Sequence, residues 1–314
     1  MKKTAFLFPG QGSQSVGMGA DWVSHSPAAR EAFEEADAVL GSPLSKLCWE
    51  GPESTLQLTA NTQPAILATS VAILRAATDE GLSADIMAGH SLGEYSALVA
   101  AGSLSFADAL TLVRRRGELM QEAVPVGIGA MAAIIGLAAA EVGAVVSEAA
   151  QGQICSIANL NSSNQIVIAG HKEAVDRAVD LAGEAGARRA VVLPVSAPFH
   201  SPLMAPAREG LTPFLRAVEF SPLSVPVVTN IDAQPITLGD DAREALIRQV
   251  DGPVRWSEST EWMAQEAGVE LFVEIGPGTV LTGLARRGLP ETRALSLSQP
   301  SGLEKLRSIL EGGE

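Results

Sequence analysis

The sequence predicts an α/β protein in which a small α+β unit is inserted into a larger α/β unit. Short apolar runs alternate with helical hydrophobic spacing over the first 123 residues, which is typical of a layered α/β fold. A different order of elements follows, and after Pro198 the first pattern returns. The chain is therefore expected to leave the large unit, form the small one and come back.

The first α/β segment is predicted from its hydrophobic periodicity. Buried strands are short continuous apolar runs, whereas helices repeat apolar residues every three or four positions. We expect strands at 4–8 and 85–88, and helices at 26–40, 63–80, 92–101 and 106–123. Pro125, Val126 and Gly127 then interrupt the helical pattern, so we place a boundary at this linker.

The middle segment has its own order of elements. Strands are predicted at 130–137, 154–159, 165–169 and 190–195, and helices at 138–150 and 172–184. The resulting order, β-α-β-β-α-β, is that of a ferredoxin-like unit. We assign residues 125–197 to this inserted subdomain.

The last segment completes the large subdomain. Strands are predicted at 225–229 and 271–275, with helices at 241–250, at 257–267 and from residue 303 onward. We therefore assign residues 1–124 and 198–314 to one α/β subdomain with a parallel sheet.

Composition excludes several classes of function. The net charge of −14, from 36 acidic and 22 basic residues, argues against a protein that binds nucleic acid or an anionic membrane. Cys48 and Cys155 are far apart and predict neither a disulfide framework nor a metal site. The first apolar stretch ends at Pro9, too early for a signal peptide, and the weakly polar run 127–140 is too short to span a bilayer. We expect a cytoplasmic protein.

The sequence "GHSLG", residues 89–93, follows a predicted strand and precedes a predicted helix. This is the arrangement of a nucleophile elbow. Glycines on both sides allow a tight turn, and the helix start directs free N–H groups and a positive dipole end toward the same point. Ser91 is thus a candidate nucleophile, although a helix N-cap serine would have the same local pattern.

A nucleophilic serine needs a base, and four histidines are available: His25, His90, His171 and His200. His25 lies in a polar, surface-like stretch, and His171 opens a predicted helix of the small subdomain. His90 adjoins Ser91 across a tight turn, where neighbouring side chains point apart. His200 lies in a loop stiffened by Pro198 and Pro202, so it is the preferred base; the alternative is a loop histidine with a structural role.

The glycine-rich turn after the first strand, "GQGSQS" at 10–15, has two familiar alternatives. It lacks the third glycine of a dinucleotide-binding turn and the Gly-Lys-Ser/Thr of a P-loop. At a strand end beside an elbow serine, such a turn can instead present a backbone N–H to an oxyanion.

Four motifs in this order carry a family resemblance: "FPGQGSQ" at 8–14, "GHSLGEY" at 89–95, "RRRGELMQEAVP" at 114–125 and "VSAPFHSP" at 195–202. With "QIVIAGH" at 165–171 and "EIGPG" at 274–278, they resemble the malonyl-CoA:acyl carrier protein transacylases of fatty acid synthesis over nearly the whole chain. The resemblance implies a hydrolase-like α/β domain with a nucleophile elbow and a ferredoxin-like insert, which agrees with the predicted layout.

The resemblance also implies roles for residues at the elbow and the loop. Ser91 becomes the nucleophile and His200 its general base. The backbone N–H groups of Gln11 and Leu92 become the donors of an oxyanion hole. The main-chain carbonyl of Gln249 orients the imidazole, so no acidic third member is required.

Substrate recognition is implied at two further positions. Arg116 matches the guanidinium that binds the malonyl carboxylate, and Phe199 would wall the acyl pocket against branched groups such as methylmalonyl. A malonyl-selective site does need a fixed cation, and one helix cannot direct three successive arginines to one site. A solvated helix face and a core phenylalanine are the alternatives. Asp251 and Gly252 depart from the family pattern, which suggests a larger residue and Asn before Pro253.

We therefore expect transfer of a malonyl group from malonyl-CoA to the phosphopantetheine thiol of an acyl carrier protein through a malonyl-serine, by a monomer without a metal or redox cofactor. A polyketide or malonate decarboxylase acyltransferase would differ in its acceptor. A serine thioesterase or esterase would share the elbow, but its histidine usually lies near the C-terminus after an acid, and Arg116 would have no role. A non-catalytic carrier-binding subunit is the third class.

Overall fold

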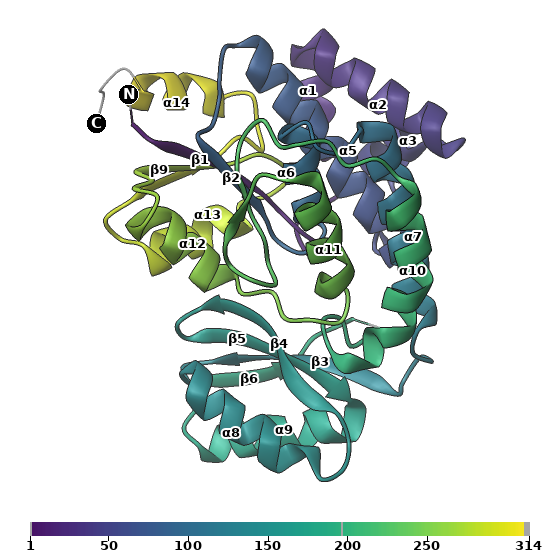
Figure 1. Ribbon diagram of the computed structural model, residues 1–314, viewed down its shortest axis with the longest axis vertical. Coiled ribbons are helices and arrows are strands. Elements are labelled where there is room, and N and C mark those ends of the chain that lie inside the picture. Colours follow the sequence, from purple (N-terminus) through teal and green to yellow (C-terminus); the bar gives the residue numbers. More distant parts are fainter. Residues whose placement is uncertain (1, 196, 311–314) are drawn as a thin grey trace.

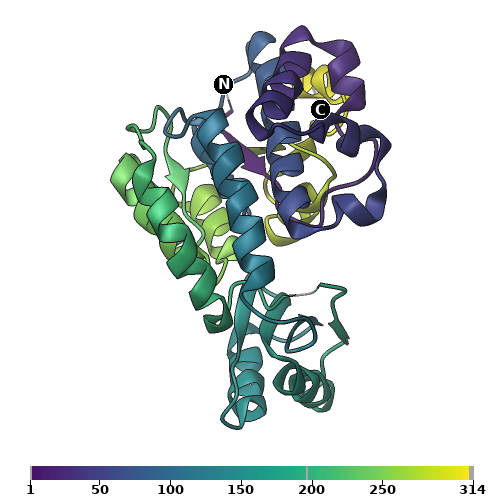
Figure 2. The same cartoon turned by 90° about the vertical axis from the view of Figure 1, so that its right-hand side faces the viewer.

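The computed structural model describes residues 2–195 and 197–310, which form two lobes with one sheet each (Figure 1). The small lobe lies below the large lobe in the views of Figures 1 and 2. This arrangement confirms the predicted α/β fold with an inserted α+β unit.

The sheet of the large lobe has the strand order β10-β9-β1-β2-β7-β8. Its strands are β1 (Thr4–Phe8), β2 (Ile86–Gly89), β7 (Val227–Val228), β8 (Pro235–Ile236), β9 (Leu271–Glu274) and β10 (Arg293–Ser296). All neighbouring pairs are parallel except β7 and β8. The carboxyl ends of β1, β2 and β7 therefore lie next to one another at one edge, where open α/β sheets usually bind their ligands.

Both faces of this sheet are buried, and β1 shows how. Phe6 and Phe8 belong to the larger core cluster, whereas Ala5 and Leu7 belong to a second cluster. Successive side chains of a strand point to opposite faces, so a continuous apolar run is required when helices cover both sides. This is why residues 4–8 lack the alternation of a strand with one exposed face.

The helices divide between the two faces according to their core contacts. The larger cluster includes residues of α1 (Ala20–His25), α2 (Pro27–Leu40), α3 (Leu44–Glu50), α4 (Glu53–Leu56), α5 (Thr59–Asp79), α6 (Gly93–Ala100), α7 (Phe106–Glu122), α10 (Ala205–Ala217), α11 (Gly239–Gln249) and α14 (Gly302–Leu310). The smaller cluster includes residues of α12 (Trp256–Gln265) and α13 (Val280–Gly288).

The small lobe has the ferredoxin-like order predicted for it. Its elements are β3 (Gly129–Ile135), α8 (Ala139–Ala150), β4 (Cys155–Ser162), β5 (Gln165–His171), α9 (Lys172–Glu184) and β6 (Arg189–Val192). The sheet order is β4-β5-β3-β6 with antiparallel pairs, and α8 and α9 share a core with it. The subdomain limits at residues 125 and 197 stay a prediction.

Several elements were not expected from the sequence. They are α1, α3, α4, α10, α13, β8, β10 and the 3-10 turn Pro202–Met204. Proline lies within α10, at Pro213, and glycine within α13, at Gly283. Both residues disfavour the interior of a helix, and packing on the core overrides that local preference.

The two lobes are joined by backbone hydrogen bonds beside β4. Leu160 N donates to Val254 O at 2.9 Å, and Val254 N donates to Ala158 O at 2.8 Å. These bonds fix the end of β4 against the large lobe. No helix in the two described ranges combines the length and apolar character needed to cross a bilayer.

Candidate active site

The turn between β2 and α6 carries Ser91, and its two glycines are required by packing. A Cβ atom at Gly89 would lie 1.9 Å from the backbone of Gly93, and one at Gly93 would lie 2.1 Å from the carbonyl oxygen of Phe8. Real Cβ atoms do not approach backbone so closely, so α6 can start against β1 only if both positions are glycine. Ser91 itself has φ 52°, an uncommon left-handed conformation for a non-glycine residue. The structure therefore has the backbone geometry of a strained elbow.

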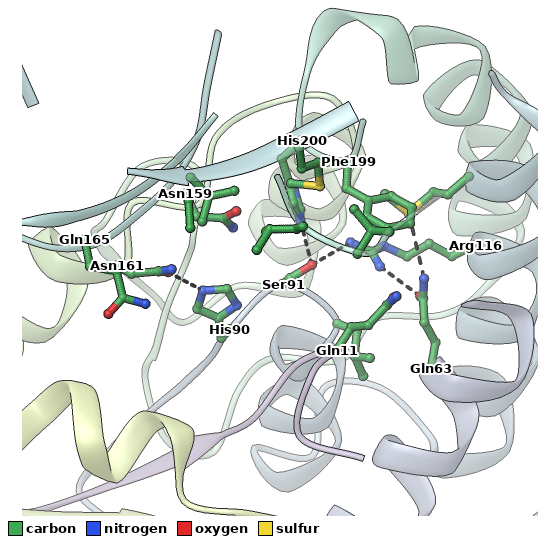
Figure 3. A pocket seen from close by; sticks show the side chains of 17 residues that line it. Gln11, Gln63, His90, Ser91, Arg116, Asn159, Asn161, Gln165, Phe199 and His200 are labelled. Atoms are coloured by element: carbon green, nitrogen blue, oxygen red, sulfur yellow. Dashed lines mark hydrogen bonds between the residues drawn. The ribbon is translucent and has the colours of Figure 1, made fainter. Parts of the chain in front are cut away.

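Ser91 and His200 belong to the two separate parts of the large subdomain and meet in space. Ser91 Oγ lies 2.7 Å from His200 Nε2 (Figure 3). His200 Nδ1 faces two carbonyl oxygens, Gln249 O at 3.0 Å and Gly252 O at 3.2 Å. Carbonyls only accept hydrogen bonds, so Nδ1 carries the ring proton and Nε2 is free to accept from the serine hydroxyl.

The imidazole of His200 is held in its neutral form. Burial lowers the pKa of His200 from 6.5 to about 3, and the positive charge of Arg116 acts in the same direction. The carbonyl acceptors at Nδ1 oppose this shift and do not cancel it. A neutral imidazole beside a serine hydroxyl can take up its proton.

Arg116 is a buried cation without a salt bridge among residues 2–195 and 197–310. Its side chain is 2% exposed. Nη1 donates to Gln63 Oε1 at 2.8 Å, and Nη2 donates to Ser91 Oγ at 3.1 Å and to Gln249 Oε1 at 3.0 Å. Its Nε has no hydrogen-bond partner in the described chain. A buried guanidinium without an anion is costly, so this site favours a ligand that brings a carboxylate.

The neighbouring arginines on α7 point elsewhere, as the helical spacing predicted. Arg114 donates to Asn61 Oδ1 at 2.5 Å, and Arg115 forms an ion pair with Glu118 at 3.0 Å. Only one of the three successive side chains reaches Ser91, because adjacent residues on a helix diverge by about 100°.

The glycine-rich turn lies directly against the elbow. A Cβ at Gly10 would lie 2.4 Å from the carbonyl oxygen of His90, so this turn too requires glycine for close approach. Gln11 and Leu92 both line the cavity beside Ser91. Neither of their backbone N–H groups donates a hydrogen bond to another residue of the described ranges. Two free donors beside a nucleophile can stabilise an oxyanion.

The cavity in front of Ser91 has a volume of about 270 Å³. Phe199, Met120, Met131, Leu193 and Val195 form an apolar part of its wall. These side chains come from both lobes, so the cavity lies at the junction between them (Figure 3). A short acyl chain that ends in a carboxylate fits this cavity, because the apolar wall can contact the chain and Arg116 can bind the carboxylate.

The segment that departs from the family pattern still supports the imidazole. The Gly252 carbonyl accepts from His200 Nδ1, and Asp251 forms an ion pair with Arg208 at 2.9 Å. A Cβ at Gly252 would lie 2.4 Å from Ile231 Cδ1. Glycine at 252 therefore fits this chain, in which Ile231 occupies the adjoining space.

His90 has a polar partner of its own in the cavity. His90 Nε2 lies 2.8 Å from Asn161 Oδ1, a residue of β4 in the small lobe, and burial lowers the pKa of His90. Its ring is directed at Asn161, whereas the imidazole that is hydrogen-bonded to Ser91 Oγ is that of His200 (Figure 3). His171 does not line the cavity. It is the N-cap residue of α9 but makes no side-chain capping bond, and its Nδ1 accepts from Ile154 N at 2.9 Å.

Several polar residues of the site were not found from the sequence. They are Gln63, Asn159, Asn161 and Gln165 in the cavity wall, and Glu94 and Asn230 below the elbow. The one available signal concerned Asn230, which follows β7. Its strand lies beside β2 in the sheet, and parallel neighbours direct their carboxyl ends to one edge. In the part of the chain that the structure describes, no group of three or more His, Cys, Asp or Glu side chains is arranged to hold a metal ion.

Comparison with known proteins agrees with this geometry. The acyl transferase domain model matches residues 5–302. The malonyl CoA-acyl carrier protein transacylase of Escherichia coli (strain K12) is 52% identical over 304 residues, which cover 96% of this chain and 98% of that protein. The relative of the same name from Bacillus subtilis (strain 168) is 48% identical over 305 residues, which cover 97% of this chain and 96% of that protein.

Solved structures show the same fold over the whole chain. The crystal structure of an acyl carrier protein S-malonyltransferase from Vibrio cholerae has a TM-score of 0.95 and 47% identity, and covers 97% of this chain and 99% of that one. The structure of a type II polyketide acyl-carrier protein in complex with its malonyl-transacylase has a TM-score of 0.95 and 47% identity, and the match covers 99% of this chain and 100% of that one. This chain belongs to the acyl transferase family, among the malonyl-CoA:acyl carrier protein transacylases.

Proposed function

We propose that the protein transfers the malonyl group of malonyl-CoA to the phosphopantetheine thiol of an acyl carrier protein and so supplies extender units for fatty acid synthesis. One observation carries this proposal. The hydroxyl of a serine that is hydrogen-bonded to a neutral histidine lies 3.1 Å from a buried arginine that forms no salt bridge among the described residues. The first pair suits acyl transfer, and the cation selects an acyl group that ends in a carboxylate.

The first half-reaction forms a malonyl-serine. Ser91 Oγ attacks the thioester carbonyl carbon while His200 Nε2 takes the hydroxyl proton. The carbonyl oxygen becomes an oxyanion and accepts hydrogen bonds from the N–H groups of Gln11 and Leu92. The carbon–sulfur bond then breaks, and the proton on His200 passes to the sulfur, so coenzyme A leaves as its thiol.

The second half-reaction reverses these steps with a new thiol. The phosphopantetheine thiol of the carrier protein gives its proton to His200, and its sulfur attacks the carbonyl carbon of the ester. The bond from that carbon to Ser91 Oγ breaks, and the proton returns to the serine oxygen. All protons and bonds are accounted for by these groups, so the proposed chemistry requires no metal or redox cofactor.

Recognition of the malonyl group is assigned to Arg116, Gln249 and Phe199, with Gln63 in support. The guanidinium of Arg116 would bind the carboxylate, and Gln63 holds its Nη1 in place. Gln249 has two functions, because its side chain accepts from Arg116 and its main-chain oxygen accepts from His200. Phe199 lies in the cavity wall, where a large rigid ring would exclude a branch on the acyl chain.

The alternatives from the sequence differ in the acceptor. For a thioesterase or esterase, water would take the acyl group, and a buried unpaired Arg116 would have no ligand. For a polyketide or malonate decarboxylase acyltransferase, the chemistry is the same and another carrier takes the malonyl group.

We propose a monomer in the cytoplasm. Both cysteines are unpaired, with Cys48 buried, as a reducing compartment allows.

Loading of Ser91 tests the function. Intact mass spectrometry after mixing with malonyl-CoA should show one added malonyl group, and Ser91→Ala should show none, because the ester oxygen is removed. Acetyl-CoA and methylmalonyl-CoA in parallel should load more slowly. An adduct that persists in Ser91→Ala would contradict the assignment, and rapid release of free malonate without a thiol acceptor would indicate a hydrolase.

The rate of acylation should be insensitive to pH in the usual histidine range. His200 acts as a base only when neutral, and its pKa in the folded protein is about 3 instead of 6.5. Lowering the pH from about 8 to about 5 therefore leaves the base in its active form. Titration of His200 should therefore change single-turnover acylation by malonyl-CoA less than about twofold over this range. A fall near the ordinary histidine value that persists in Glu94→Gln would refute the shift of His200, whereas a fall that Glu94→Gln abolishes would identify Glu94, whose pKa burial raises to about 7.

A further inference from the structure

A group of buried polar side chains lies behind the nucleophile elbow and is not part of the cavity wall. Asn230, Glu94 and the Gln249 side chain are each 1% exposed or less, and none of the three lines the cavity. Buried polar groups are costly unless they are hydrogen-bonded, so their partners indicate why the chain keeps them here.

Asn230 binds the elbow turn on both sides of His90. Its Oδ1 accepts from Ser91 N at 2.6 Å, and its Nδ2 donates to Gly89 O at 2.7 Å. One amide thus bridges the two backbone groups that enter and leave the turn. The left-handed conformation of Ser91 costs on the order of 1–3 kcal/mol and persists only when surrounding contacts enforce it. Asn230 supplies two of those contacts.

Glu94, in the first turn of α6, anchors the main chain of Asn230. Its Oε2 accepts from Asn230 N at 2.8 Å and from Gln249 Nε2 at 2.9 Å. Gln249 Nε2 also donates to Ser91 O at 3.0 Å. The Asn230 side chain therefore holds the main-chain N–H of Ser91, and the Gln249 side chain holds its C=O. Both residues also donate to the Glu94 carboxylate, Asn230 from its main chain and Gln249 from its side chain.

We propose that Asn230 is a positioning residue for acyl transfer, which acts through the backbone of Ser91 and is itself anchored by Glu94. The two hydrogen bonds at the turn keep Ser91 Oγ at 2.7 Å from His200 Nε2 and between the free N–H groups of the oxyanion hole. Asn230 does not line the cavity and has no hydrogen bond to Arg116 in the described ranges, so we expect its effect to be the same for every acyl group. This inference rests on the proposed function.

The variant Asn230→Ala tests the proposal with three measurements on the full chain. They are the maximal single-turnover acylation rate of Ser91, the half-saturating acyl-CoA concentration, and the thermal midpoint. With malonyl-CoA and with acetyl-CoA alike, the maximal rate should fall about 10- to 100-fold, because a misplacement of about 1 Å costs up to that factor. The half-saturating concentrations and the malonyl-to-acetyl rate ratio should stay within about threefold.

Two matched variants separate positioning from simple destabilisation. Asn164→Ala removes an exposed asparagine amide of the small lobe and should retain the wild-type rate. Val269→Ala removes buried apolar volume from the second core cluster, and should lower the thermal midpoint without lowering the acylation rate of the folded protein. Glu94→Gln keeps the side-chain length and should produce a smaller loss of the acetyl-CoA acylation rate than Asn230→Ala.

Three results would overturn the inference. Asn230→Ala could acylate at the wild-type rate, or lose no more activity than Val269→Ala at an equal thermal midpoint. It could also lose malonyl transfer at least about tenfold more than acetyl transfer, which would place Asn230 in carboxylate binding. If the alanine variant does not fold, Asn230→Ser, which cannot bridge both backbone groups, takes its place with the same expectations. Wild-type protein that fails to load Ser91 would refute the function itself, whereas normal loading by both proteins would refute only the positioning role.

Discussion

Replacing His200 with alanine is expected to lower kcat/KM for malonyl transfer about 10²- to 10⁴-fold, the contribution of a positioned general base. His200 Nε2 lies 2.7 Å from Ser91 Oγ, at hydrogen-bonding distance. Without it, the hydroxyl must lose its proton to water. Steady-state transfer to a carrier protein measures the loss, and the intact mass after long incubation should still show slow loading of Ser91.

A second histidine provides the control for this variant. His25 is exposed, and His25→Ala should retain wild-type kcat/KM. Wild-type activity in His200→Ala would refute the assigned base. His90, which lines the same cavity, would then be the next candidate base.

Replacing Arg116 with alanine is expected to remove the preference for malonyl over acetyl groups. A hydrogen bond to a charged partner contributes about 1.5–3 kcal/mol, so each bond lost to the carboxylate lowers kcat/KM for malonyl-CoA about 10- to 150-fold. An acetyl group has no carboxylate, so kcat/KM for acetyl-CoA should change much less. The ratio of the two constants, measured with one protein preparation, gives the shift.

Two further arginine variants sharpen this result. Arg116→Lys keeps a positive charge but loses the planar pair of donors, and should recover only part of the preference. Arg114→Ala changes the same helix at a side chain that bonds to Asn61, and should leave the ratio unchanged. If the malonyl preference of Arg116→Ala equals that of the wild type, another cation binds the carboxylate.

Periodicity predicted the elements that carry strong local signals. The β1 strand is a continuous apolar run, and α9 was expected at 172–184, where the structure has it. The elements that were missed have weak or contrary signals. The β10 strand is four residues long at the edge of the sheet, and α10 contains a proline. Such segments adopt their structure because the rest of the core covers them, and no short window of sequence contains that information.

The expected site residues also differ in how the structure supports them. Ser91 and His200 are in contact although they lie 109 positions apart. Arg116 donates to Ser91 Oγ, and Gln249 contacts both Ser91 and His200. Their roles, and those of Gln11, Leu92 and Phe199, stay predictions until the variants are measured. Gln11, Leu92 and Phe199 line the cavity beside Ser91, which is compatible with these roles.

The sequence by itself determined the elbow and its chemistry. The glycines at 89 and 93 are needed wherever a strand turns this tightly into a helix, so their spacing specifies the backbone around Ser91. Only the tertiary structure decided what holds that turn. Asn230 lies 139 positions from Ser91, and Glu94 meets it through a backbone N–H that any residue would offer. Hydrogen bonds between such distant positions arise from the order of strands in the sheet and leave no periodic pattern along the chain.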